Sequence, residues 1–293
     1  MKRQFKYLTT SEEDFTWGMQ LSVAGSAQIA PGSPYPQGDH PSEYTFNWKT
    51  GRILQEYQLN YITEGAGIFE NRSGRFQVKE GSLMMILPGE WHRYRPLNKT
   101  GWVENYVGFK GKIADHFFQH PFFAEKPAVL QLGIKEELID THLKIMDLIE
   151  KEQPGYQQIA SGMVVKMLGY IVSFEKQRGF SGKPIARVIE ESRFFMRQNT
   201  DREIDIEALA KQHHVGYSYF RKMFKKYTGV SPGQYHLQLR ILRAKEMLVS
   251  TNLSVKEICM ELGFQTIHYF SLVFKKKTGM SPSEFRKTKN PTA

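Results

Sequence analysis

Hydrophobic and polar positions alternate in the first part of the chain. Between Ile53 and Tyr61, four of the five odd positions are apolar, and Leu54 is the one apolar even position. A period of two is typical of a strand with one buried face. Residues 64–67 have the composition of a turn, and short strand-like runs follow at 68–69, 76–78, 83–87 and 102–109. Several short strands at close spacing predict a β sandwich or barrel over residues 40–110.

The pattern then becomes helical. Over residues 135–151 and 156–178, apolar side chains recur three and four positions apart, and Pro154 and Gly155 separate the two segments. This spacing predicts two amphipathic helices. Their apolar stripes could pack on the sheet of their own domain or form a helix-to-helix dimer seam, and both roles are compatible if different faces serve them. Residues 177–184 are polar and rich in turn formers, which predicts a linker.

An internal repeat with an offset of 50 residues occupies the C-terminal part of the chain. Four motifs recur at this offset: Tyr-Phe at 219 and 269, Phe-Lys-Lys at 224 and 274, Thr-Gly at 228 and 278, and Ser-Pro at 231 and 281. Each copy is predicted to form a short helix, a tight turn and a second helix, and the second helices cover about 216–227 and 266–277. A further helix from Pro232 to about Leu248 connects the two copies.

The positive charge of the chain lies in this repeat. Residues 183–293 carry 20 Lys and Arg against 10 Asp and Glu, whereas residues 1–182 carry 20 of each, so the C-terminal part accounts for the whole net charge of +10. A basic part joined to a neutral part indicates binding to an anion such as nucleic acid or anionic lipid. Two short helices joined by a tight turn, doubled and basic, favour DNA.

The second helix of each copy has an apolar packing stripe, Phe220, Met223, Phe224 and Tyr227 in the first copy and Phe270, Val273 and Phe274 in the second. The side chains that face away from these stripes are the candidate DNA contacts. Arg221 and Lys222 could donate to O6 and N7 of guanine in the major groove, whereas Lys225 is better placed for phosphate. The second copy offers fewer donors, and Ile267 and Leu272 are expected to touch thymine methyl groups. The whole set is Tyr217, Ser218, Arg221, Lys222, Lys225, Ile267, His268, Ser271, Leu272 and Lys275.

The composition excludes several classes of protein. A length of 293 residues predicts about two domains, which we place at residues 1–179 and 184–293, with a linker at 180–183. Cys259 is the only cysteine, which excludes a disulfide scaffold and cysteine-based zinc fingers and fits a reducing compartment. No apolar run reaches the roughly 18 residues of a membrane helix, and no apolar segment typical of a secretory signal follows the basic start. A cytoplasmic protein without membrane partners is expected.

The second copy of the repeat resembles the second helix-turn-helix motif of the AraC/XylS (arabinose-regulator) family of bacterial transcription factors. The residues that carry this resemblance are Ile258-Cys259, Gly263-Phe264, Tyr269-Phe270, Phe274-Lys275-Lys276, Thr278-Gly279 and Ser281-Pro282. The resemblance implies an α+β two-domain chain, with an N-terminal cupin-like β-barrel that carries two helices and a C-terminal all-α double helix-turn-helix. It also implies binding to direct repeats in promoter DNA and contact with RNA polymerase, and a homodimer is expected.

The sequence departs from the family pattern in three places. His213-His214 occupies the turn of the first copy, where the family usually has Ala-Gly, and Cys259 replaces a common Ala. Leu272 replaces a common Arg, which puts a base contact at this position in doubt.

A strand-like run at 81–87, the segment Pro88-Gly89-Glu90-Trp91-His92-Arg93-Tyr94 and a Trp-led strand at 101–109 carry a second resemblance. Through them, residues 40–180 resemble the cupin-type sensor domain of sugar-responsive members of the family. The resemblance implies ligand contacts at Glu104 and Tyr106, where the arabinose regulator has His and Trp. Both residues are compatible with a sugar, although not with the same sugar bound in the same way. The alternatives are barrel packing for Tyr106 and an outward-facing Glu104. The remaining ligand candidates follow a Pro-Gly turn and form either a pocket rim or a structural corner: Trp91, His92 and Tyr94.

The residues present disfavour two enzyme functions. A cupin enzyme would need a His-x-His metal motif, and the chain has His92-Arg93-Tyr94 instead, so neither an enzyme nor a metal or other cofactor is expected. A DNA-repair alkyltransferase would need a reactive cysteine, and Cys259 is expected to pack as a small hydrophobe. A regulator whose barrel only dimerises is a third alternative, which ligand titration would distinguish. The family resemblance therefore implies a DNA-binding transcription regulator controlled by a small molecule such as a sugar, and family habit implies an activator rather than a repressor. Residues 1–45 contain four prolines, which is consistent with a loose arm or lid.

Overall fold

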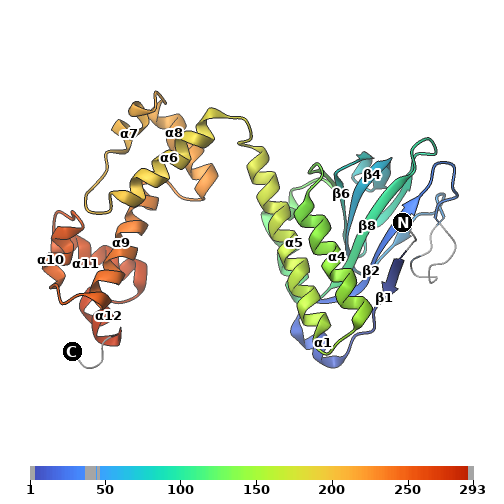
Figure 1. Cartoon of the computed structure of the whole chain (residues 1–293), viewed down its shortest axis with the longest axis horizontal. Coiled ribbons are helices and arrows are strands. Elements are labelled where there is room, and N and C mark those ends of the chain that lie inside the picture. The colour runs from blue at the N-terminus through green and yellow to red at the C-terminus, as the bar shows by residue number, and fades with distance from the viewer. Residues whose placement is uncertain (1–3, 37–43, 45–46, 290–293) are drawn as a thin grey trace. The chain divides into compact units, whose positions relative to one another are not determined.

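The chain divides into two units (Figure 1). The computed structural model describes residues 4–36, 44 and 47–289, and the N-terminal unit ends at Glu175. This unit is β-rich and carries two long helices, and the other unit is helical, which confirms the predicted α+β two-domain fold. The segment 180–183 lies between α5 (Tyr156–Arg178) and α6 (Pro184–Gln198). The domain limits at 179 and 184 stay predictions.

The strands of the N-terminal unit form an antiparallel, branched sheet. They are β1 (Gln4–Tyr7), β2 (Gln20–Ile29), β3 (Arg52–Ile53), β4 (Tyr57–Asn71), β5 (Gly74–Lys79), β6 (Ser82–Ile86), β7 (Trp91–Pro96), β8 (Trp102–Lys110) and β9 (Val129–Gln131). The main path runs β1-β2-β8-β4-β6-β9, and β3 pairs with β7. The long strand β4 pairs with β6 and β8 up to Gly65 and with β5 and β7 from Ala66 onward. The described strands do not close into the predicted barrel, because the short strand β9 pairs only with β6 and ends the path.

The prediction of a turn at 64–67 is wrong, because these residues continue β4. Gly65 has a φ of +81°, and a Cβ there would lie 2.2 Å from the carbonyl oxygen of Gly101. A Cβ on Gly67 would lie 2.3 Å from the ring of Trp102. The glycines therefore allow a bulge and the close approach of backbone and ring within a strand, rather than a reversal of the chain.

The prediction of a loose N-terminal arm is wrong for residues 4–29. β1 pairs with β2, and β2 lies between β1 and β8 within the sheet. The prolines that suggested an arm come after β2, and Pro41 lies outside the described residues. The smaller helices of this unit are α1 (Glu12–Trp17), α2 (Lys112–Gln119) and α3 (Pro121–Ala124).

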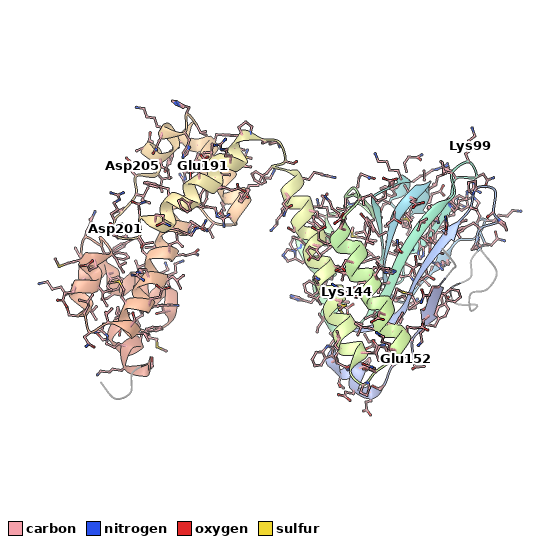
Figure 2. The ribbon with its side chains drawn as sticks, viewed as in Figure 1. Lys99, Lys144, Glu152, Glu191, Asp201 and Asp205 are labelled. Carbon is pink, nitrogen blue, oxygen red and sulfur yellow. The ribbon has the colours of Figure 1, made fainter. Side chains whose placement is uncertain are left out.

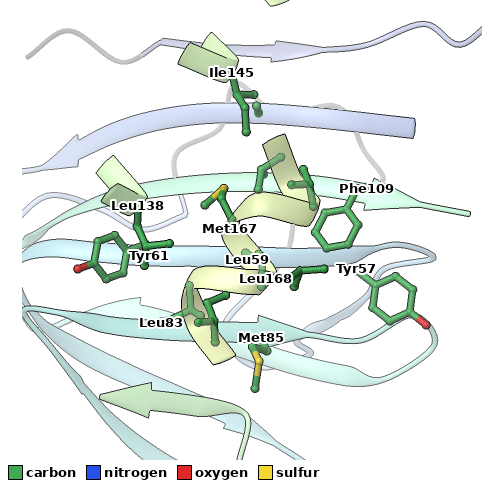
Figure 3. Close-up of a cluster of buried hydrophobic side chains, with 14 of the residues drawn as sticks. Tyr57, Leu59, Tyr61, Leu83, Met85, Phe109, Leu138, Ile145, Met167 and Leu168 are labelled. Atoms are coloured by element: carbon green, nitrogen blue, oxygen red, sulfur yellow. The ribbon is translucent and has the colours of Figure 1, made fainter. Parts of the chain in front are cut away.

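Both predicted amphipathic helices are confirmed. α4 (Glu136–Lys151) and α5 lie side by side against one face of the sheet (Figure 1). Leu138 of α4 and Met167 of α5 pack with Leu59 and Phe109 of the sheet in one buried cluster (Figure 3). Alternate side chains of a strand point to opposite faces, so the even-numbered neighbours on β4 and β8 point away from these helices.

The C-terminal unit contains two helix-turn-helix motifs, as predicted. The helices after α6 are α7 (Ile206–Gln212), α8 (Tyr217–Thr228), α9 (Pro232–Ser250), α10 (Val255–Glu261), α11 (Ile267–Thr278) and α12 (Pro282–Lys289). Gly229 and Gly279 end α8 and α11 in the left-handed conformation that glycine favours, with φ of +86° and +87°. Each motif has a core of its own, around Phe224 in the first and Phe274 in the second. Within the described part of the chain, no helix is long and apolar enough to cross a membrane.

Candidate DNA-binding surface and ligand site

The outward face of α8 is the first part of the candidate DNA-binding surface. Phe220, Met223 and Phe224 point into the first core. The five predicted contacts of this helix are all exposed on its other side: Tyr217, Ser218, Arg221, Lys222 and Lys225. The guanidinium of Arg221 lies 5.5 Å from the centre of the Tyr217 ring, so these two side chains are neighbours on the helix surface.

The outward face of α11 has a different chemistry. Of its predicted contacts, Ser271 is half-buried and the others are exposed: Ile267, His268, Leu272 and Lys275. Two exposed tyrosines of these helices were not among the predicted DNA contacts. Tyr219 on α8 and Tyr269 on α11 are each 50% exposed, directly before a fully buried phenylalanine. The available signal was the repeat itself, which places both tyrosines at the same position of their helices.

A set of polar side chains lies on the face of the N-terminal sheet that points away from α4 and α5. We call it the interior cluster. Its members are buried or half-buried and come from β3, β4, β7, β8 and the loop segments near them: Tyr35, Tyr44, Arg52, Glu56, Gln58, Asn60, His92, Tyr94, Glu104 and Tyr106. Apolar rings and side chains around Trp102 and Phe69 surround them.

Glu104 on β8 is a buried member of the interior cluster. Its side chain accepts hydrogen bonds from the Tyr35 hydroxyl at 3.3 and 3.5 Å. Burial raises the pKa of Tyr35 well above its ordinary value, and the Glu104 charge adds to this effect, so the hydroxyl keeps its proton. Glu104 is 6% exposed, which excludes the outward-facing alternative.

Arg52 connects His92 and Tyr94. Its Nε donates to Nε2 of His92 at 3.2 Å, and its Nη2 donates to the Tyr94 hydroxyl at 2.5 Å. Nδ1 of His92 lies 3.0 Å from the carbonyl oxygen of Glu90, which can only accept, so Nδ1 carries the proton. Burial, together with the nearby Arg52 charge, lowers the pKa of His92 to about 4. The imidazole is therefore neutral at pH 7.

A second carboxylate, Glu56, lies in the same interior. It accepts from the Tyr44 hydroxyl at 3.0 Å and from Nε2 of Gln58 at 2.8 Å. A Cβ on Gly108 would lie 2.4 Å from Oε1 of Glu56, so this glycine leaves the space that the carboxylate occupies. The formal charge of the interior cluster is negative, because it holds two carboxylates and one guanidinium while its histidine is neutral.

Two buried polar atoms of this interior have no hydrogen-bond partner among the described residues. One is Oδ1 of Asn60, whose Nδ2 donates to the Tyr94 hydroxyl at 3.4 Å. The other is Nε1 of Trp102, whose ring centre lies 5.7 Å from that of Tyr35 and 6.1 Å from that of Tyr94. Buried polar groups nearly always have a partner in the protein, in water or in a ligand. One acceptor and one donor are thus available to a bound molecule.

The structure brings four of the five predicted ligand residues into the interior cluster. His92, Tyr94 and Glu104 are described above. The side chain of Tyr106 on β8 covers Gly25 of the neighbouring strand β2, where a Cβ would lie 2.6 Å from the Tyr106 hydroxyl. Trp91 is the exception. It alternates with His92 on β7 and points the other way, with Nε1 donating to the carbonyl oxygen of Thr50 at 2.7 Å.

Sequence reasoning missed Tyr35, Arg52 and the polar positions of β4. The alternation over 53–61 predicts a strand with one solvent-facing side, yet Gln58 and Asn60 are 2% and 1% exposed. The polar side of this strand faces the interior, and the available signal was a run of amide and carboxylate side chains at 56, 58 and 60. Within the described ranges, no three His, Cys, Asp or Glu side chains gather as a metal site.

Comparisons with known proteins identify both units. Residues 24–157 match the AraC-like ligand binding domain family, and residues 209–288 match a helix-turn-helix domain family. The HTH-type transcriptional regulator YdiP of Escherichia coli is 30% identical over 254 residues, which cover 82% of each chain. The lactose operon transcription activator of Staphylococcus xylosus is 22% identical over 73% of this chain and 77% of its own length. The transcriptional activator RhaR of Mannheimia succiniciproducens is 24% identical over 78% and 84%.

The fold, the matching families and these relatives define a DNA-binding transcription regulator with a ligand-binding domain, and not an enzyme. The chain belongs to the AraC family of transcription regulators.

Proposed function

We propose that this regulator is a cytoplasmic, homodimeric activator controlled by an uncharged polyhydroxylated molecule such as a sugar. The observation that carries the ligand proposal is the interior cluster, in which an acceptor at Asn60 and a donor at Trp102 have no hydrogen-bond partner in the described part of the chain. Sugar hydroxyls both donate and accept, and aromatic rings cover the apolar face of a sugar. An acidic ligand is disfavoured, because its charge would lie near Glu56 and Glu104. One relative is a lactose operon activator, which agrees with a sugar.

Thermal unfolding with a panel of mono- and disaccharides and their acids tests this proposal. All four tryptophans lie in the N-terminal unit, so tryptophan fluorescence of the full chain reports on the ligand-binding unit alone. A ligand at 100 times its dissociation constant should stabilise this unit by about 2.7 kcal/mol. Glu104→Gln should reduce the stabilisation, and Glu64→Gln, the same change at an exposed position of β4, should not. A flat panel would favour the alternative in which the N-terminal unit only dimerises.

We further propose that α8 and α11 bind direct repeats in promoter DNA and that α8 supplies more of the base readout. Arg221 and Lys222 present donors for guanine, whereas two of the five outward side chains predicted as contacts on α11, Ile267 and Leu272, are apolar. Arg221→Ala should cost about 1–3 kcal/mol on specific DNA and less on random DNA. Equal losses on both DNAs would assign Arg221 to phosphate binding instead. Activation would then proceed through contact with RNA polymerase.

The dimer seam is proposed on the outer side of α4 and α5. Leu143 and Ile159 are apolar yet each 53% exposed, while Met163 is half-buried against the core. Ile159→Glu should therefore lower the sedimentation coefficient with little loss of stability, and unchanged sedimentation would reject this face. In the dimer, ligand binding would favour one arrangement of the two DNA-binding units over another. The free energy of this shift cannot exceed the difference in the ligand's binding free energy for the two arrangements.

A further inference from the structure

The two helix-turn-helix motifs share α9 but not a core. Leu239 in the first half of α9 packs with the first core, and Ile241 and Met247 in the second half belong to the second. A cavity of about 360 Å³ lies between the motifs, lined by Ile206 of the first and Phe264 of the second. Continuous apolar packing therefore does not fix the orientation of α8 relative to α11.

Two buried polar side chains attach the shared helix α9 to both motifs instead, His236 to the first and Arg240 to the second. His236 and Arg240 lie one turn apart on the same face of the helix and are 3% and 5% exposed. Nε2 of His236 lies 2.9 Å from the carbonyl oxygen of Asn199, at the C-terminal end of α6. Nε and Nη2 of Arg240 donate to the carbonyl oxygen of Leu262, at the C-terminal end of α10, at 3.0 and 2.8 Å.

The chemistry of these contacts suits a rigid connection between the two motifs, which we call the joint. Carbonyl groups at the end of a helix lack partners within it, and a cation is favoured there by the helix dipole. The Arg240 guanidinium also lies 3.8 Å from the centre of the ring of Phe264, in the turn of the second motif. Only a planar guanidinium supplies two parallel donors and a stacking face at once, so lysine would keep one donor but not the full set of contacts.

The turn of the second motif also touches the first motif directly. Gly263 has a φ of +65°, and a Cβ there would lie 2.5 Å from the carbonyl oxygen of Asp201 and 2.6 Å from Cα of Arg202. These two residues belong to the loop between α6 and α7, where Figure 2 labels Asp201. This contact joins the backbone of one motif to the backbone of the other, so one motif has little freedom to rotate relative to the other.

We propose that His236 and Arg240 are positioning residues for DNA recognition, which hold α8 and α11 at a fixed spacing so that the two motifs read two DNA segments as one body. This inference rests on the proposed binding of both motifs to repeated DNA segments. A rigid joint raises the effective concentration of the second motif once the first is bound, and it makes affinity depend on the distance between the segments.

DNA selected from a random pool by the wild-type chain supplies a two-segment site, and scrambling one segment supplies single-segment sites. In Arg240→Met and His236→Ala, affinity for the two-segment site should fall about tenfold while affinity for single segments stays constant. Inserting one to three base pairs between the segments should weaken the wild-type chain strongly and these variants much less. Arg243→Met removes an exposed arginine from the same helix and should keep the wild-type dependence on spacing.

Equal losses on all DNAs, or an unchanged dependence on spacing in both variants, would overturn the proposal. His236→Gln and Arg240→Lys retain a donor and should fall between the wild type and the truncated variants in this dependence, which general destabilisation would not produce. If circular dichroism shows that Arg240→Met does not fold, His236→Ala carries the same test. A wild-type chain that selects no DNA would instead reject the proposed function itself.

Discussion

Acidification from pH 7 to pH 5 should destabilise the N-terminal unit. His92 and His142 are buried there, and burial is the main cause that lowers the pKa of each to about 4. An unfolded histidine has a pKa of about 6.5. Between these values the unfolded state binds a proton that the folded state does not. The contribution of each neutral histidine to the free energy of unfolding is therefore fully present above the pKa of the unfolded state. It is lost as the pH falls toward the pKa of the folded state.

The linkage relation gives the size of this loss. With the pKa values above, each histidine lowers the free energy of unfolding by about 2 kcal/mol between pH 7 and pH 5, and the pair by about 4 kcal/mol. A domain is typically stable by only about 5–15 kcal/mol. The contacts agree with the direction: a proton on Nε2 of His92 would face the Nε–H of Arg52, and Nε2 of His142 has no partner among the described residues.

Urea denaturation of the full chain, followed by tryptophan fluorescence at the two pH values, measures this loss in the N-terminal unit alone. His92→Gln and His142→Gln should each remove about half of the pH dependence, and the double variant should remove most of it. His116→Gln, the same change at an exposed position, should behave like the wild type. A wild-type free energy that is equal at both pH values, or a double variant that loses as much as the wild type, would refute the reasoning.

Three further changes test other parts of the molecule. Lys275→Gln should make the slope of log affinity against log salt shallower by about one unit, because Lys275 is exposed in the last turn of α11, and an unchanged slope would count against a phosphate contact. His214→Gly should raise the melting temperature of the C-terminal unit, followed by circular dichroism, by relieving a φ of +56° that costs about 1 kcal/mol. Gly108→Ala should lower the N-terminal free energy of unfolding by about 1–3 kcal/mol, because the methyl group would meet Glu56, and a neutral result would show that this carboxylate moves freely.

Helix ends and repeated helices could be predicted from the sequence because they depend on local rules. Ser231 and Gln234 form the capping box that opens α9, and Ser254 and Glu257 form the one that opens α10. Each box joins residues three positions apart, so a short stretch of sequence contains the whole interaction. The helical periods of α4 and α5 are equally local, because one face packs on a single neighbouring surface.

The interior cluster could not be predicted in this way. Alternation shows that the two faces of β4 differ, but it does not show which face meets solvent. Gln58 and Asn60 are enclosed because the second half of β4 pairs with β5 and β7 while its first half pairs with β6 and β8. The role of Arg52 could not be predicted either, because its partner His92 lies 40 positions away and no local pattern connects the two residues.

The two helices proposed to contact DNA, α8 and α11, differ in the chemistry of their outward side chains. This difference explains what a fixed connection at Arg240 would contribute to DNA recognition. α8 carries Arg221, which can hydrogen-bond a base directly, whereas Ile267 and Leu272 of α11 can offer only apolar contact. Such contact alone is too weak to locate a DNA segment, because docking a free motif costs translational and rotational entropy. If α8 has already docked and the joint is rigid, α11 meets only the segment at the matching distance, and a small preference there changes the affinity for the whole site. The spacing set by His236 and Arg240 can therefore add specificity to the weaker base readout proposed for α11.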